Sequence, residues 1–291
     1  MMPLRRFAIH QPRSVREAAE MLAQYGESGR LYAGGTELLL AMKHDLLRYE
    51  HLVDVKTISG LDKIEIKNAS LSVGGSATHR AIERSSLARE HFPVLTEMES
   101  KVANVRVRAS GTLGGNLCFA EPHSDPATLL VALNATVRVQ GRGNERTMTV
   151  NELLRGAYET ALTQDELLTA VEIPLPEKSR RAAYVKFQIH ERPTLGLALV
   201  LDLDDSGWAV KGARAVVGSI SPRPCRSEKA EELLVGSIES VKHQLAEAGK
   251  ALSDAAEPVD DLEGSAEYKR HLVNVFLFRA FDQALATRRL D

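Results

Sequence analysis

Apolar and polar residues follow helical spacing near the N-terminus of the chain. The residues on one helical face are Val15, Ala18, Ala19, Leu22 and Ala23. Ser14-Val-Arg-Glu17 has the pattern of a capping box, which starts a helix. Short apolar runs at 31–33 and 52–55 predict strands. The pattern therefore predicts a small α/β unit over residues 1–58.

A second unit is expected over residues 59–176, where strand alternation becomes more common. Apolar and polar residues alternate over 61–66, residues 71–74 form the partner strand, and 68–70 supply the turn. The other expected elements are helices over 78–87, 93–102 and 127–133, a hairpin of 137–140 with 147–150, and a strand over 167–173. This unit is predicted to be α+β.

Residues 174–181 form the clearest linker, because they combine two prolines with a cluster of charges and have little to bury. The third unit, over 177–291, begins with apolar runs that predict antiparallel strands and ends with helical spacing. Its expected elements are strands over 183–189, 195–202 and 208–220 and a helix over 266–287.

Two glycine pairs, Gly34-Gly35 and Gly114-Gly115, each follow a hydrophobic segment and have threonine, asparagine or glutamate beside them. Glycine has no Cβ, so the backbone can take positive φ and its amides can approach a ligand closely. A third pair, Gly74-Gly75, is expected to be only a strand-end turn. Glycine pairs also mark ordinary tight turns, so spacing alone leaves a phosphate or dinucleotide site and plain turns both open.

Asp125-Pro126 has the pattern of an N-cap followed by proline at the first helical position. A polar segment that leads into a helix N-terminus can hold phosphate or ribose oxygens. Asp125 can also serve only as the cap of its helix, and the two roles can coexist.

The composition of the chain limits the classes of function that it can have. The 291 residues carry a net charge of −2, which gives no basic footprint for nucleic acid, and no apolar run reaches the length of a membrane span. The two cysteines, Cys118 and Cys225, fit neither a disulfide framework nor a metal site, and favour a reducing cytoplasm. The nine histidines lack zinc-ligand spacing, so they are expected on surfaces or in turns. His123, beside the second glycine pair, is the exception that could contact a ligand.

No Ser/His/Asp or Cys/His arrangement and no HExxH motif is present in the sequence. Arg106 and Arg108 precede the second glycine pair and could meet phosphate or a partner subunit, or occupy solvated strand positions. The sequence therefore predicts no catalytic residue that attacks an organic substrate and no metal ligand.

Ala33-Gly-Gly-Thr-Glu37 and Thr112-Leu-Gly-Gly-Asn116, in this order, resemble the two flavin-binding motifs of one protein family. That family comprises the medium, FAD-binding subunits of molybdenum hydroxylases, such as carbon monoxide dehydrogenase, quinoline oxidoreductase and xanthine dehydrogenase-like enzymes. The resemblance covers nearly the whole chain. Further similar runs are His51–Val55, Leu71–Gly75, Asn104–Arg108, Glu166–Pro174 and Tyr184–Phe187.

The resemblance implies an α+β fold. A two-lobed FAD-binding domain of the PCMH (vanillyl-alcohol-oxidase-like) type, with lobes 1–58 and 59–176, would precede a C-terminal flavoprotein domain, 177–291, with an antiparallel sheet and helices. The FAD-binding residues implied are Ala33, Gly34, Gly35, Thr36, Glu37, Thr112, Gly114, Gly115, Asn116, Asp125, Leu168 and Lys186. Glu37 stands where the family often has Asp or Ser, and Lys186 could instead be a solvated strand lysine.

The resemblance also implies partners. A large subunit would carry the molybdopterin-type molybdenum cofactor and hydroxylate the substrate, and a small subunit would carry two [2Fe–2S] clusters, in an (αβγ)2 assembly. This chain would carry FAD alone and pass the electrons on, since it lacks the cysteine-rich insertion of relatives with an extra cluster. A stand-alone PCMH-type FAD oxidoreductase and a non-catalytic nucleotide-binding module are the alternatives. Substrate and electron acceptor stay open.

Overall fold

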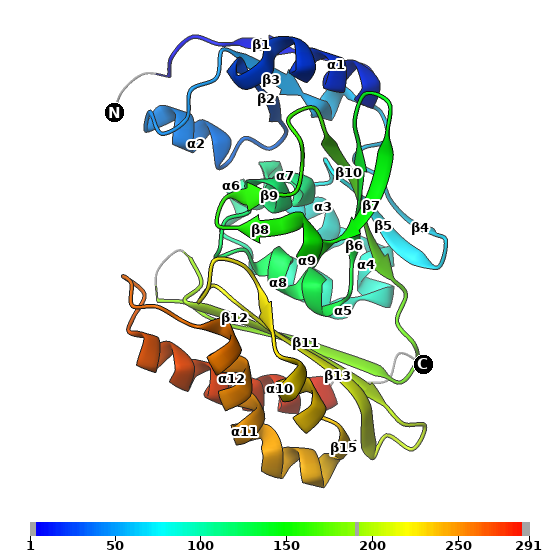
Figure 1. Cartoon of the computed structure of the whole chain (residues 1–291). Helices are drawn as coiled ribbons and strands as arrows, with labels where there is room; N and C mark the ends of the chain where they lie inside the picture. The colour runs from blue at the N-terminus through cyan, green and yellow to red at the C-terminus, as the bar shows by residue number, and fades with distance from the viewer. Residues whose placement is uncertain (1–3, 190–191, 287–291) are drawn as a thin grey trace.

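The computed structural model describes residues 4–189 and 192–286, which form an α+β protein with three stacked units (Figure 1). The N-terminal unit is a parallel sheet of order β1-β3-β2. Its elements are β1 Ala8–His10, α1 Val15–Tyr25, β2 Gly29–Tyr32, α2 Leu38–Lys43 and β3 His51–Asp54. Leu52 and Val53 of the central strand are completely buried, so this small sheet has its own apolar interior.

Helix α1 confirms the predicted helix but only half of the predicted capping box. The Ser14 side chain accepts from the Glu17 N–H at 3.1 Å, as a cap requires. The Glu17 carboxylate accepts from the Arg13 N–H instead of the Ser14 N–H. Ala23, predicted on the buried face, is exposed, because the face that packs on the sheet is the narrower stripe of Ala18, Ala19 and Leu22.

The middle unit contains an antiparallel sheet of order β4-β5-β10-β6-β7. Its strands are β4 Ile64–Lys67, β5 Ser70–Gly74, β6 Thr136–Gln140, β7 Glu145–Thr149 and β10 Leu167–Pro174, with a small ladder of β8 Leu154–Gly156 and β9 Glu159–Thr160 beside it. Both predicted hairpins are confirmed. The first turns through Asn68 and Ala69, whose φ angles are 49° and 55°.

Seven helices are described in the middle unit. They are α3 His79–Arg84, α4 Ser86–His91, α5 Pro93–Ser100, α6 Val105–Ser110, α7 Leu113–Phe119, α8 Asp125–Ala132 and α9 Val150–Leu153. The single helix predicted over 78–87 is wrong, because Ser85 has extended backbone and caps α4. Arg106 and Arg108 lie on helix α6 and not on a strand, because Asn104 caps that helix by accepting from two backbone N–H groups. Arg108 is paired with Glu83.

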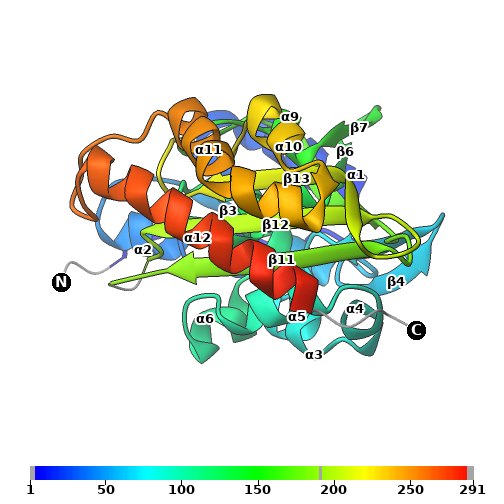
Figure 2. The same cartoon turned by 90° about the horizontal axis from the view of Figure 1, so that it is seen from below.

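The C-terminal unit confirms the predicted antiparallel strands and the long final helix. Its first strand begins at Arg180, inside the predicted linker of residues 174–181, because Arg180 already pairs with Asp202 of the next strand. Its sheet has the order β11-β12-β13-β14, with β15 also paired to β13. The elements are β11 Arg180–Phe187, β12 Leu195–Leu203, β13 Ala209–Gly218, β14 Cys225–Arg226, α10 Glu228–Leu233, β15 Gly236–Ser237, α11 Ile238–Ala256 and α12 Ala266–Ala286. Thr287, the predicted end of the helix, lies outside the described residues. Helices α11 and α12 cover one face of this sheet (Figure 2).

The other face of the C-terminal sheet packs on helix α8 of the middle unit. Val216 from β13 and Tyr184 from β11 belong to the core of the middle unit. The approach is close, since a Cβ on Gly218 would lie 2.0 Å from Oγ1 of Thr128 on α8. Successive strand residues point to opposite faces, so Tyr184 and Lys186 both point toward α8.

A buried lysine fixes the segment before helix α12. Lys269 is completely buried, and its Nζ donates to the Val259 carbonyl at 2.9 Å and pairs with Asp261. We expect Asp261→Ala to lower the free energy of unfolding by about 1–3 kcal/mol, because the buried ammonium keeps only its carbonyl partner. Lys269→Met should cost less, since it removes the buried charge. Urea unfolding of both variants checks this order, and the reverse order would contradict it.

Candidate functional site

A cavity of about 590 Å³ lies where the three units meet. All twelve residues singled out from the sequence line it: Ala33, Gly34, Gly35, Thr36, Glu37, Thr112, Gly114, Gly115, Asn116, Asp125, Leu168 and Lys186. Its volume is that of a site for a small molecule or cofactor. The fold therefore brings together segments that are far apart in the sequence.

The first glycine pair occupies the turn between β2 and α2. Gly35 has a φ of 69°, which favours glycine. A Cβ on Gly34 would lie 2.3 Å from the Ser110 carbonyl oxygen, so the turn is packed directly against the segment that leads to the second glycine pair. Lys56 Nζ donates to the Ala33 carbonyl at 2.8 Å and supports the turn from outside. The first glycine segment (residues 33–37) and the second glycine segment (residues 110–116) are therefore neighbours in space.

The amides of this first turn are available to a ligand. Among the hydrogen bonds recorded for the described residues, none is donated by the backbone N–H of Gly34, Gly35, Thr36 or Glu37. Successive unpaired N–H groups in a turn form a concave surface that binds anions. The turn is thus the part of the cavity best suited to a phosphate group.

The second glycine pair differs from its prediction. It is not an open turn but the first turn of helix α7, where Thr112 is the N-cap and accepts from the Gly115 N–H at 3.1 Å. The Gly114 N–H donates to the Gly75 carbonyl at 3.1 Å. A Cβ on Gly114 would lie 2.4 Å from that same oxygen, so the glycine is needed for close packing and not for positive φ. Gly75, which also lines the cavity, was missed as a site residue.

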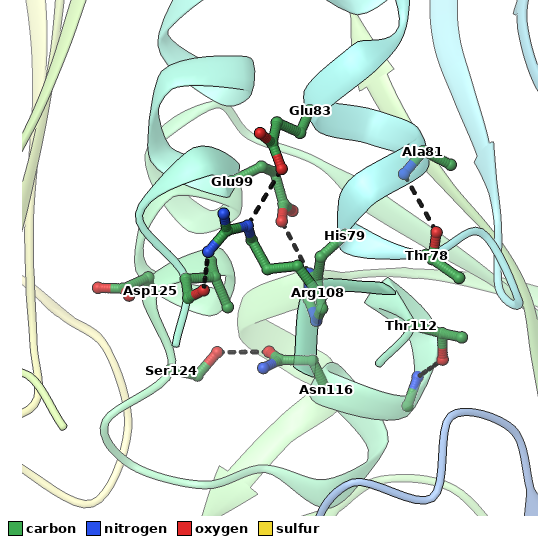
Figure 3. A network of polar contacts seen from close by, with 12 residues as sticks. Thr78, His79, Ala81, Glu83, Glu99, Arg108, Thr112, Asn116, Ser124 and Asp125 are labelled. Atoms are coloured by element: carbon green, nitrogen blue, oxygen red, sulfur yellow. Dashed lines mark hydrogen bonds and ion pairs between the residues drawn. The ribbon is translucent and has the colours of Figure 1, made fainter. Parts of the chain in front are cut away.

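Gly115 and Asn116 are two members of this helix that remain open to a ligand. Gly115 is exposed, and a Cβ there would meet only the Thr112 hydroxyl, at 2.8 Å. The side-chain Oδ1 of Asn116 accepts from the Ser124 hydroxyl at 2.6 Å (Figure 3). Its amide NH2 has no recorded partner among the described residues. Helix α7 therefore offers open space and a side-chain donor.

Asp125 is not the N-cap that the sequence predicted. Ser124 caps α8 by accepting from the Ala127 N–H, and Asp125 is the first helical residue. The Asp125 carboxylate accepts from the Tyr184 hydroxyl at 2.6 Å and from Lys186 Nζ at 3.0 Å. Lys186 is not a solvated lysine, because its side chain is 11% exposed. Asp125 thus joins the middle and C-terminal units at the cavity wall.

Burial raises the pKa of Asp125, and the charge of Lys186 and the hydrogen bond from Tyr184 offset part of this rise. Burial and the adjacent carboxylate raise the pKa of Tyr184 well above its usual value. Because the pKa of Tyr184 is higher in the folded chain than in the unfolded chain, its contribution to stability is fully present below pH 10. This contribution is lost as the pH rises further. Above pH 10 the tyrosine hydroxyl ionises in the unfolded chain and stays protonated in the folded chain, so the free energy of unfolding falls.

We therefore expect the stability deficit of Tyr184→Phe to shrink above pH 10. At neutral pH the variant should lose about 1–3 kcal/mol, because Asp125 loses a buried donor. Above pH 10 the wild type should lose stability relative to the variant by up to about 1.4 kcal/mol per pH unit. Urea midpoints from pH 8 to 11 measure the difference, and a deficit that grows with pH would contradict the assignment.

Arg192 and Glu121 line the cavity and were not predicted, whereas His123, which also lines it, was singled out from the sequence. Arg192 lies 2.8 Å from Glu121 and 3.7 Å from Glu37, so it connects the C-terminal unit to the first glycine segment and to the loop after helix α7. Glu121 also lies 2.7 Å from His123 Nδ1, which makes His123 a cavity residue held by a carboxylate. No spacing of residues in the sequence predicts a role for Arg192, because its partners are distant in sequence.

His79 contradicts the expectation that the histidines lie on surfaces or in turns. It is 3% exposed, lines the cavity and lies 2.7 Å from the completely buried Glu99 (Figure 3). Cys118 also lines the cavity. Burial raises the pKa of its thiol to about 11, so it is not a thiolate nucleophile at neutral pH.

Two family models match the chain. One, described as the FAD binding domain in molybdopterin dehydrogenase, matches residues 5–176, which is more than half of the chain. The chain belongs to this family. The other, the CO dehydrogenase flavoprotein C-terminal domain, matches residues 184–284.

Individual relatives support the assignment of the chain to this family. The carbon monoxide dehydrogenase medium chain of Afipia carboxidovorans is 31% identical over 96% of this chain and 97% of its own length. The reconstituted CO dehydrogenase from Oligotropha carboxidovorans has a chain that superposes with a TM-score of 0.93 at 30% identity, covering 99% of this chain and 100% of that one. Quinoline 2-oxidoreductase from Pseudomonas putida 86 gives a TM-score of 0.90 at 27% identity, over 98% of both chains.

This chain is thus an FAD-binding oxidoreductase component of the molybdenum hydroxylase family, and its relatives include medium chains of carbon monoxide dehydrogenase. The cavity fits the cofactor, because it combines a turn of unpaired amides, a glycine whose side-chain space is open, and polar side chains. No helix of residues 4–189 and 192–286 is long and apolar enough to cross a membrane. In the same residues, no group of three or more His, Cys, Asp or Glu side chains could hold a metal ion.

Proposed function

We propose that this medium subunit holds FAD between its two glycine segments and passes electrons from the [2Fe–2S] clusters of a small partner subunit to an external acceptor. The observation that carries the proposal is the convergence of both segments on one cavity, with Gly34 packed against Ser110. FAD, when bound, accepts electrons singly and releases them in pairs. The chain's own residues supply binding and orientation.

Each part of the cavity suits one part of FAD. The unpaired amides of residues 34–37 would bind the diphosphate. Asn116, through its free NH2, and Asp125, through its carboxylate, would hold sugar or ribityl hydroxyls. Leu168, which is 7% exposed, would supply apolar contact to the flavin ring. Lys186 would keep the Asp125 carboxylate ionised through its charge.

The proposed partners are a large subunit with a molybdenum cofactor and the small [2Fe–2S] subunit, in an (αβγ)2 assembly. The names of relatives support this proposal, since they include medium chains of carbon monoxide dehydrogenase and a medium subunit of nicotine 6-hydroxylase. Both cysteines of the chain are free thiols, which is typical of a reducing compartment, and we infer a cytoplasmic assembly.

Metal analysis of the native assembly tests this function. The chain, tagged in its source cells and purified with its partners, should bring down molybdenum, iron and FAD together. Addition of the substrate of the complex should bleach the flavin only when the iron-containing partner is present. Purification of a chain that carries FAD alone and turns over an organic substrate by itself would support the stand-alone oxidoreductase and overturn the proposal.

A further inference from the structure

Helix α3 begins with a histidine that the proposed FAD contacts do not use. The His79 backbone N–H donates to the Gly111 carbonyl at 3.0 Å, which ties the residue to the start of the second glycine segment. A Cβ on Gly111 would lie 3.2 Å from His79 Cδ2 and 3.4 Å from Thr36 Oγ1. The imidazole therefore lies where the two glycine segments meet, at the wall of the cavity.

The ring is held in one orientation by a buried carboxylate. His79 Nδ1 lies 2.7 Å from Glu99 Oε2, and Glu99 is completely buried on helix α5. A carboxylate that accepts from one ring nitrogen fixes the proton on that nitrogen and turns the other nitrogen toward its own ligand. In the described chain, no hydrogen bond is recorded for His79 Nε2. Figure 3 shows the ring between Glu99 and helix α7, which carries Asn116.

The Glu99 carboxylate is buried together with the imidazole that it holds. Glu99 Oε1 is buried and has no partner among the described residues. An ionised carboxylate in that position is costly unless a positive charge accompanies it. An imidazole that carries a proton on each nitrogen can donate to Glu99 through Nδ1 and, at the same time, to an anion in the cavity through Nε2.

We infer that His79 is a diphosphate-binding residue and that Glu99 is the residue that positions it. The inference rests on the proposed FAD site. The Nε2–H of His79 would donate to a diphosphate oxygen from the side opposite the amides of residues 34–37. The site would then combine backbone donors from the first glycine segment with one imidazole donor beside the second.

Two substitutions separate the two ring nitrogens. Asparagine keeps a donor near the position of Nδ1, so His79→Asn should preserve the bond to Glu99 and remove the donor to the ligand. Glutamine reaches the position of Nε2, so His79→Gln should do the opposite. Equilibrium binding of FAD, ADP and adenosine is measured with each purified variant. Adenosine lacks the diphosphate and reports effects that do not involve it.

We expect His79→Asn to weaken FAD and ADP binding about 10–100-fold, as for loss of a charge-assisted hydrogen bond. Adenosine binding should change little, and His79→Gln should recover part of the loss. Glu99→Gln should weaken ADP binding in the same direction and reduce its dependence on salt, because the imidazole loses the anionic partner of its Nδ1. Thr96→Val, a buried substitution on the same helix α5 that lies off the cavity, should bind as the wild type does.

Wild-type affinity for FAD and ADP in His79→Asn would overturn the inference. Equal losses for ADP and adenosine would also overturn it, because they would indicate a structural role for His79. These outcomes are distinct from failure of the proposed function, in which the wild-type chain itself would bind no FAD.

Discussion

Gly115→Val is expected to abolish FAD retention while leaving the fold intact. A valine side chain on helix α7 would enter the open space at this position, where only the Thr112 hydroxyl lies within 4 Å of an added Cβ. That hydroxyl must shift, which weakens the Thr112 N-cap, and such a cap contributes about 1 kcal/mol to stability. The cost to the fold is therefore small, whereas the ligand loses the space that it needs.

Two glycine variants serve as controls for this result. Gly143→Val lies in the turn between β6 and β7, where no atom of the described residues comes within 4 Å of an added Cβ, and should retain FAD. Gly34→Val should lose both FAD and stability, because its Cβ would lie 2.3 Å from a backbone oxygen. Flavin content after gel filtration and thermal melting distinguish the three variants. Full flavin content in Gly115→Val would refute the position assigned to the cofactor.

Asp125→Ala is expected to cost about 3–5 kcal/mol of unfolding free energy, because it leaves a buried tyrosine hydroxyl and a largely buried lysine without their shared acceptor. It should also weaken FAD binding. Lys186→Met should cost less, since Asp125 can then become protonated. Burial already raises the pKa of that carboxyl.

Urea unfolding of both variants, with intrinsic fluorescence and far-UV circular dichroism as probes, measures the costs. Asp125→Asn is the matched control, because the amide keeps the volume and an acceptor for the Tyr184 hydroxyl. A loss below about 1 kcal/mol in Asp125→Ala would contradict the role of this residue as the link between units.

Local sequence pattern predicted those elements whose stability is mainly local. The hairpin of β6 and β7 follows from alternation and turn residues, and the strands β11 to β13 follow from their apolar runs. Helix α7 did not, because Gly114 and Gly115 lower helix propensity. The Thr112 cap and the contact of Gly114 with Gly75 override that propensity, and such a contact is not visible in a linear pattern.

The members of the site were easier to predict than their roles. The glycine segments could be identified by resemblance, but the packing of Gly34 on Ser110 depends on the tertiary fold. Ser124 and Asp125 are equally good N-caps by type. The choice between them is decided by Tyr184 and Lys186, whose hydroxyl and ammonium hold the Asp125 carboxylate away from the cap position.

A crystal structure of the FAD-loaded chain tests the central claim most directly. We predict the diphosphate between the backbone amides of residues 34–37 and the first turn of helix α7, with the flavin ring near Leu168. A dinucleotide bound elsewhere, or a diphosphate that contacts only one of the two glycine segments, would contradict the account.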